Sequence, residues 1–105
     1  MSSELLRSEK YFIQFLLETS EQQAKIVLYN PTNNQIQALS EIARNLISLQ
    51  LPKKYSTVVK KNKRFLQLLG KDKTSFRSKL STIRKHLSTF LKIIRMIKDS
   101  LILLL

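Results

Sequence analysis

The last part of the chain carries a regular apolar pattern that constrains the fold more than any other feature. Between residues 76 and 104, apolar residues recur alternately four and three positions apart, the spacing of one helix face. Sustained over about four heptads, this spacing predicts a long amphipathic helix that packs along other helices or pairs with a second copy. A straight helix of roughly 30 residues would span about 45 Å, so it either projects or bends. The packing seam consists of Phe76, Leu80, Ile83, Leu87, Phe90, Ile94, Ile97 and Leu101, and Leu104 continues it.

The rest of the sequence predicts more helices and no sheet. A single glycine and two prolines leave few of the turn residues that β-hairpins need. A Ser or Thr followed by Gln three positions later, at Thr19 and Thr32, is typical of a helix start. We expect Gly70 to end its helix in the left-handed conformation, and Leu68 to belong to that helix's core face. We therefore predict an all-α fold, a compact array of about five helices with a long amphipathic C-terminal helix, in a single domain covering residues 1–105.

Positive charge is concentrated in the second half of the chain. Residues 1–50 hold 4 basic and 5 acidic residues, whereas residues 51–105 hold 15 basic and 2 acidic residues. Residues 1–50 thus form a near-neutral helical half and residues 51–105 a basic helical half, within a formal net charge of +12. A field of this size repels itself in a compact domain and attracts polyanions, so it indicates a nucleic-acid or anionic-surface partner.

Twelve basic residues are the candidate nucleic-acid contacts. They lie on the helix expected before Gly70, in the turn after it, and in rows that flank the seam of the last helix. Such rows can follow a phosphate backbone, and each phosphate that they neutralise releases condensed counterions. No zinc finger, helix-turn-helix or aromatic series is evident, so we expect binding that does not read base sequence. The candidates are Lys53, Lys54, Lys60, Lys61, Lys63, Arg64, Lys71, Lys73, Arg77, Arg84, Lys85 and Lys92.

Signatures of catalysis and of metal binding are missing from the sequence. The chain has no cysteine, so neither disulfides nor thiolate metal sites are possible. His86 is the only histidine and is expected to be a helix-surface residue beside Lys85. One glycine cannot build a glycine-rich phosphate loop. We expect no catalytic residue, no metal, no cofactor and no enzyme activity.

The sequence also bears on where the protein acts. Charges among the apolar residues near the N-terminus leave no continuous apolar core for a secretory signal. The longest uncharged apolar run, residues 101–105, is far shorter than the ~20 residues that cross a bilayer. We therefore expect an intracellular protein, located in the nucleus or the cytoplasm, or packaged in a virion.

The charge and the seam leave two classes of function open. The first is a non-enzymatic protein that binds and condenses double-stranded DNA without sequence specificity. The alternative is a helical accessory protein that self-assembles into a homo-oligomer or acts on membranes through its last helix. Basic rows beside an apolar stripe that ends in residues 101–105 also describe a helix lying on an anionic membrane surface.

One stretch of the sequence resembles a known family. Residues 35–46 (QIQALSEIARNL), Leu51–Pro52, the Lys/Arg run and residues 68–73 (LLGKDK) with Ser75 are similar to small basic proteins of adintoviruses and related Polinton-type (Maverick) elements. The resemblance covers roughly residues 15–80 and implies a small protein of a double-stranded DNA virus or virus-like transposon. Many of those proteins end in a glycine pair and an apolar tail, similar to the adenoviral small basic core protein that condenses packaged DNA. This chain has no glycine pair and ends in a longer charged heptad helix.

Overall fold

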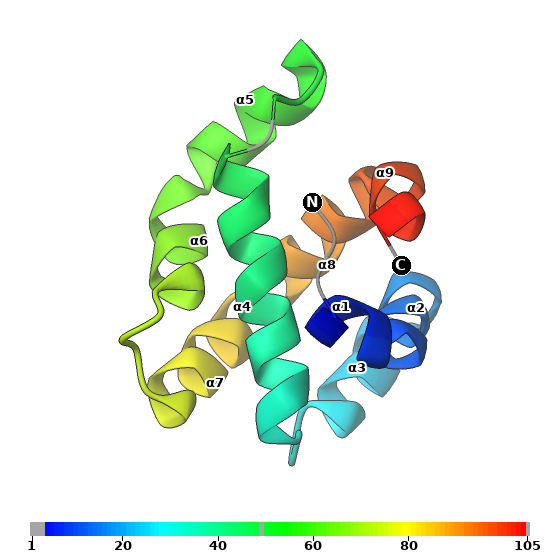
Figure 1. The fold of residues 1–105 in the computed structure, drawn as a ribbon, viewed down its shortest axis with the longest axis vertical. Coiled ribbons are helices and arrows are strands. Elements are labelled where there is room, and N and C mark those ends of the chain that lie inside the picture. Colours follow the sequence, from blue (N-terminus) through cyan, green and yellow to red (C-terminus); the bar gives the residue numbers. More distant parts are fainter. Residues whose placement is uncertain (1–3, 49, 105) are drawn as a thin grey trace.

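The described part of the chain consists of helices and the turns that connect them. The computed structural model describes residues 4–48 and 50–104, with side chains as far as residue 102, and this part contains no strand. Figure 1 shows α4 running down the middle, with α5 at the top, α6 and α7 on one side and α1, α2, α3 and α9 on the other. The helices are α1 (Glu4–Ser8), α2 (Lys10–Glu18), α3 (Glu21–Val27), α4 (Asn33–Ser48), α5 (Lys53–Lys61), α6 (Lys63–Gly70), α7 (Phe76–Lys85), α8 (Leu87–Met96) and α9 (Lys98–Leu104).

The all-α prediction is confirmed, but the expected number of helices is wrong. The described residues form nine helices and not about five, because three of the expected helices are interrupted. The interruptions lie at Glu9, Asn62, His86 and Ile97, where φ is between −103° and −116° and ψ between 18° and 23°. The predicted long C-terminal helix is therefore divided into α7, α8 and α9.

The interruptions keep the apolar faces against one core. The Cα atoms span 35 Å along the longest axis, less than a straight final helix would need, and their radius of gyration is 12.5 Å. At Asn62, the side-chain Nδ2 donates a 2.9 Å hydrogen bond to the Val58 carbonyl. At His86, the imidazole stacks on Phe65 of α6, with ring centroids 4.7 Å apart. Side-chain contacts thus accompany the bends at both places.

Helix starts follow local capping chemistry. The reciprocal capping box predicted at Thr32 is present, since Thr32 Oγ1 accepts from Gln35 N–H and Gln35 Oε1 accepts from Thr32 N–H, both at 3.0 Å. The box predicted at Thr19 is replaced by a single cap one residue later, because Ser20 caps α3 and accepts from Gln23 N–H at 3.1 Å. Ser75 caps α7 in the same way.

Gly70 does not adopt the left-handed conformation that we expected, since no described glycine has positive φ. It is instead the last residue of α6, and it is buried against α4. A Cβ at this position would lie 2.8 Å from Arg44 Cγ and 3.2 Å from the Arg44 backbone nitrogen. Close approach of α4 and α6, and not backbone conformation, therefore requires glycine here.

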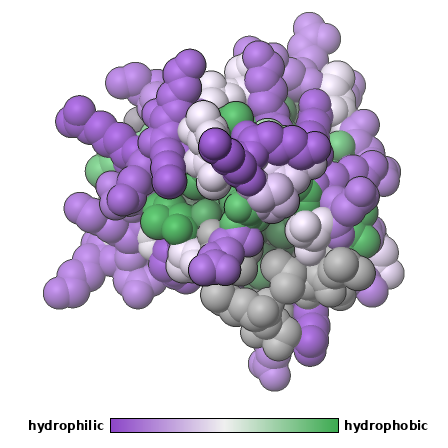
Figure 2. Space-filling view, turned by 90° about the horizontal axis from the view of Figure 1, so that it is seen from above, coloured by the Kyte–Doolittle hydropathy of each residue, from purple (hydrophilic) through white to green (hydrophobic). Residues whose placement is uncertain are grey.

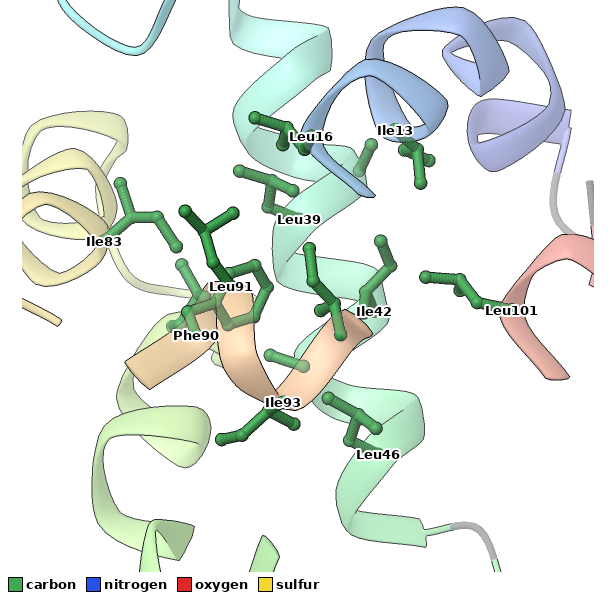
Figure 3. Close-up of a cluster of buried hydrophobic side chains, with 14 of the residues drawn as sticks. Ile13, Leu16, Leu39, Ile42, Leu46, Ile83, Phe90, Leu91, Ile93 and Leu101 are labelled. Atoms are coloured by element: carbon green, nitrogen blue, oxygen red, sulfur yellow. The ribbon is translucent and has the colours of Figure 1, made fainter. Parts of the chain in front are cut away.

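The predicted seam lies mostly inside the chain's own core. Six of its eight residues, from Ile83 to Leu101, are 5% exposed or less, whereas Phe76 and Leu80 are half-buried. The side chain of Leu104 lies outside the described residues. Leu91 and Ile93, which the heptad pattern omits, are buried too, so α8 is covered on most sides. Figure 3 shows residues of α8 among buried residues of α2, α4, α7 and α9, namely Phe90, Leu91 and Ile93 with Leu16, Leu39, Ile42, Ile83 and Leu101.

Candidate nucleic-acid interface

The twelve predicted contact residues are all solvent-exposed. The other three basic residues of residues 51–105 differ, because Lys79 is buried and Arg95 and Lys98 are half-buried. Figure 2 looks down on the molecule from above Figure 1 and shows hydrophilic side chains projecting from most of this face, with small hydrophobic areas between them. The fold thus presents the predicted cations to solvent and keeps apolar atoms below them.

Most of the exposed cations lie on three consecutive helices. Lys53, Lys54, Lys60 and Lys61 belong to α5, and Lys63 and Arg64 belong to α6. Lys71 and Lys73 lie in the turn to α7, which carries Arg77, Arg84 and Lys85. In Figure 1, these helices follow one another along one edge of the molecule. Lys92 is on α8 instead.

A surface hollow brings together cations that are distant in sequence. Lys61 and Arg64, beside the α5–α6 interruption, line it together with Lys85 from the end of α7. The hollow has a volume of about 440 Å³. The stacked rings of Phe65 and His86 form part of its wall. Three basic side chains around one depression create a local positive field suited to an anion such as a phosphate.

Helix α6 separates this hollow from a second depression. A groove on the α4 side of α6 is lined by Arg64, Leu68 and Lys71, together with residues of α4. Arg64 and Leu68 border both depressions, so they form the outer ridge of α6. Leu68 is 43% exposed, which corrects its assignment to the core face of this helix. The two depressions together contain Lys61, Arg64, Lys71 and Lys85 of the predicted set.

Three arginines bind backbone carbonyls at the ends of other helices. Arg84 of α7 donates to the carbonyls of Leu28 and Tyr29 at the end of α3. Arg95 of α8 donates to the carbonyls of Leu16 and Thr19 at the end of α2. These guanidinium groups satisfy C-terminal carbonyls that have no intrahelical partner, and they complement the helix dipole.

Arg44 is the third of these arginines. We call Arg44, Arg84 and Arg95 the arginine clips, because each one joins its own helix to the C-terminal end of another. Arg44 donates to the Gly70 carbonyl at 3.0 Å and forms an ion pair with Asp72. The basic half contains only two acidic residues, Asp72 and Asp99. One of the two therefore takes part in this structural contact. Among the predicted DNA contacts, Arg84 also has a structural role, because its guanidinium binds backbone carbonyls at the end of α3.

Lys79 is a buried cation that sequence reasoning did not single out. Its side chain on α7 is fully buried, and Nζ donates to Ser40 Oγ at 2.9 Å and to Gln37 Oε1 at 3.4 Å. Burial lowers the pKa of Lys79 below its usual 10.5, repulsion from Arg44 lowers it further, and attraction to Asp72 offsets part of this effect. Lys79 follows Phe76 by three residues and precedes Ile83 by four. This spacing places Lys79 on the same helix face as these two apolar residues and could have indicated its burial.

The described residues also bear on the expectations for metal binding, His86 and membrane-spanning helices. They contain no group of three His, Cys, Asp or Glu residues placed to hold a metal ion. His86 is half-buried and stacked on Phe65, so the prediction of a simple surface histidine is wrong. Between residues 4 and 104, apart from residue 49, no helix is long and apolar enough to cross a membrane.

Comparison with protein-family models, curated proteins and solved structures finds no significant match to this chain.

Proposed function

We propose that this protein binds double-stranded DNA through the phosphate backbone, without sequence specificity and without catalysis, and that it compacts the DNA it covers. The observation that carries the proposal is the convergence of Lys61, Arg64 and Lys85 on one hollow, within a surface of exposed cations on α5, α6 and α7. Cations held on helices can contact successive phosphates with little loss of backbone entropy on binding.

The resemblance to small basic proteins of adintoviruses and Polinton-type elements agrees with this role. On this resemblance, we propose that the activity serves the packaging of viral or virus-like DNA, inside the infected cell or the virion. Because the contacts are made to phosphates, we expect similar affinity for any duplex and a steep dependence on salt.

A membrane-surface function receives less support from the packing. A helix that lies in a bilayer interface needs a free apolar face. Leu87, Phe90 and Ile94, which would supply that face in the last helical region, are at most 3% exposed within the chain's own core. Insertion would require these helices to leave the core, whereas DNA binding uses side chains that are already exposed.

The test is a titration of two short duplexes of unrelated sequence with the wild-type protein. We expect equal affinities for the two duplexes, falling about 10³–10⁵-fold between 50 and 200 mM salt if six to ten phosphates are contacted. Absence of binding at low salt, or strong preference for one duplex, would contradict the proposal.

A matched pair of variants locates the interface. The first variant combines Lys61→Glu, Arg64→Glu and Lys85→Glu, and the second combines Arg7→Glu, Lys10→Glu and Lys25→Glu in the near-neutral half. Both replace three positive charges by three negative ones, so they change the net charge equally. We expect the first variant to lose affinity for both duplexes and to show a salt slope smaller by about 3, and the second to stay close to wild type. Equal losses in the two variants would show that net charge, and not this surface, determines binding.

A further inference from the structure

A small cavity lies between the last turns of α4, the turn that follows it and the junction of α8 with α9. Its volume is about 200 Å³. The walls are formed by Ile42, Leu46, Ile97 and Leu101, each 5% exposed or less, and by the half-buried Leu51. An apolar cavity of roughly 150 Å³ in a protein core can remain dry and bind benzene, so this cavity has room for a molecule of that size or slightly larger.

One buried polar side chain interrupts the apolar lining. Asn45 is 6% exposed and lines both this cavity and the groove on the α4 side of α6, and its Nδ2 has no hydrogen-bond partner among the described residues. Proteins pair nearly all buried donors, so an unpaired one requires a physical explanation. In apolar surroundings an amide N–H interacts strongly with any acceptor placed against it. Gln50 and Ser100, which are exposed, give the cavity a polar rim.

We propose that this cavity binds a small, neutral, mainly apolar molecule that bears one carbonyl oxygen, and that this oxygen accepts a hydrogen bond from Asn45 Nδ2. The ligand is neutral because one amide donor does not offset the cost of removing a carboxylate from water. The apolar walls select the body of the ligand, and the amide selects its polar group. This site is independent of DNA binding, and its test needs no nucleic acid.

The test compares acetophenone with ethylbenzene, which has a similar shape but no acceptor. The full-length protein, labelled with ¹⁵N, is titrated with each compound while the side-chain amide resonance of Asn45 and the melting temperature are followed. We expect acetophenone to shift this resonance saturably, to raise the melting temperature and to bind about tenfold more tightly than ethylbenzene, the ratio that one good hydrogen bond supplies.

Two variants and one control separate the walls from the amide. Asn45→Leu keeps a similar volume without the donor, and we expect it to lose the preference for acetophenone. Ile97→Phe fills the cavity and is expected to abolish binding of both compounds, whereas Asn34→Leu, at an exposed position near the start of α4, is expected to bind like wild type.

Three results would overturn the proposal. They are the absence of a saturable shift with acetophenone, equal affinity of the wild type for the two compounds, and contact of the Asn45 amide with water that persists at saturating acetophenone. The last result would show that the cavity holds only an ordered water.

Discussion

Lys79 shows how much the surroundings of one residue change its role. Its ammonium group is buried against two neutral partners, Ser40 and Gln37, and no carboxylate of the described residues binds it directly. Burying a charge without a counter-ion costs free energy, which accounts for the lowered pKa. Burial of this residue therefore opposes folding at pH values below its lowered pKa, where the ammonium is charged, whereas most other lysines of the chain stay in water.

The stability of the protein relative to Lys79→Met should depend on pH. Because the folded-state pKa of Lys79 lies below the unfolded value of 10.5, there is a pH window between the two in which only the unfolded chain holds this proton. The contribution of Lys79 to the free energy of unfolding therefore rises with pH through that window. Urea denaturation of both proteins at pH 7 and at about pH 10 measures it.

We expect wild type to gain stability relative to Lys79→Met at the higher pH. The comparison cancels the titration of all the other lysines and tyrosines, which both proteins share. A difference between the two proteins that stays constant with pH would contradict the lowered pKa.

At the scale of helices, the arginine clips join elements that few other polar contacts connect. Arg44 joins α4 to the end of α6, Arg84 joins α7 to α3, and Arg95 joins α8 to α2. Each clip spans at least 26 residues of sequence and ends on a helix C-terminus. The planar guanidinium can reach two carbonyls at once, which a lysine ammonium does less well.

Removal of a clip should cost more than removal of an exposed cation from the same helix. Arg95 and Lys92 both lie on α8, but only Arg95 binds carbonyls. We expect Arg95→Ala to lower the free energy of unfolding by about 1.5–3 kcal/mol, the usual range for hydrogen bonds to charged groups. Lys92→Ala should change it by less than about 0.5 kcal/mol. Urea denaturation decides the matter, and equal effects would mean that the Arg95 contacts add nothing to stability.

At the scale of the whole molecule, the fold must hold a strongly basic half together. Residues 51–105 contain 15 basic and 2 acidic residues, and one of the acidic residues is bound by Arg44. Mutual repulsion among these charges opposes the compact state. A single hydrophobic core, with residues from both halves of the chain, counteracts this repulsion.

Sodium chloride should therefore raise the melting temperature while it weakens DNA binding. Screening reduces the repulsion in the folded protein, and each kcal/mol gained corresponds to a rise of about 4–8 °C for a domain of this size. The variant with Glu at positions 61, 64 and 85 has fewer repulsive pairs and should show a smaller rise. Thermal scans at several salt concentrations measure both proteins. A melting temperature that falls with salt would indicate that attractive ion pairs dominate instead.

The sequence revealed the features that depend on local chemistry. The capping box at Thr32 involves residues three positions apart, and the seam follows helical spacing, so both could be read from the chain. The exposure of Lys61, Arg64 and Lys85 followed in the same way, because they lie off the apolar stripes. The hollow that gathers them could not be predicted, since it depends on how α6 packs beside α7.

The differences between prediction and structure arise from contacts between distant segments. The bend at His86 accompanies stacking on Phe65, and Gly70 is required by the proximity of Arg44. No periodicity in the sequence encodes either partner. For the same reason the arginine clips were missed, because a sequence shows that an arginine is present but not which carbonyl it reaches.

The division between guanidinium clips and exposed lysines has a chemical consequence. Acetylation removes the charge of an amine and leaves arginine unchanged. An acetylating enzyme or an acylating reagent would therefore reduce the positive charge of the surface step by step, while Arg44, Arg84 and Arg95 continue to join the helices. Lys79 would be shielded by its burial. The affinity for a polyanion could thus be adjusted by covalent modification in a molecule that stays folded.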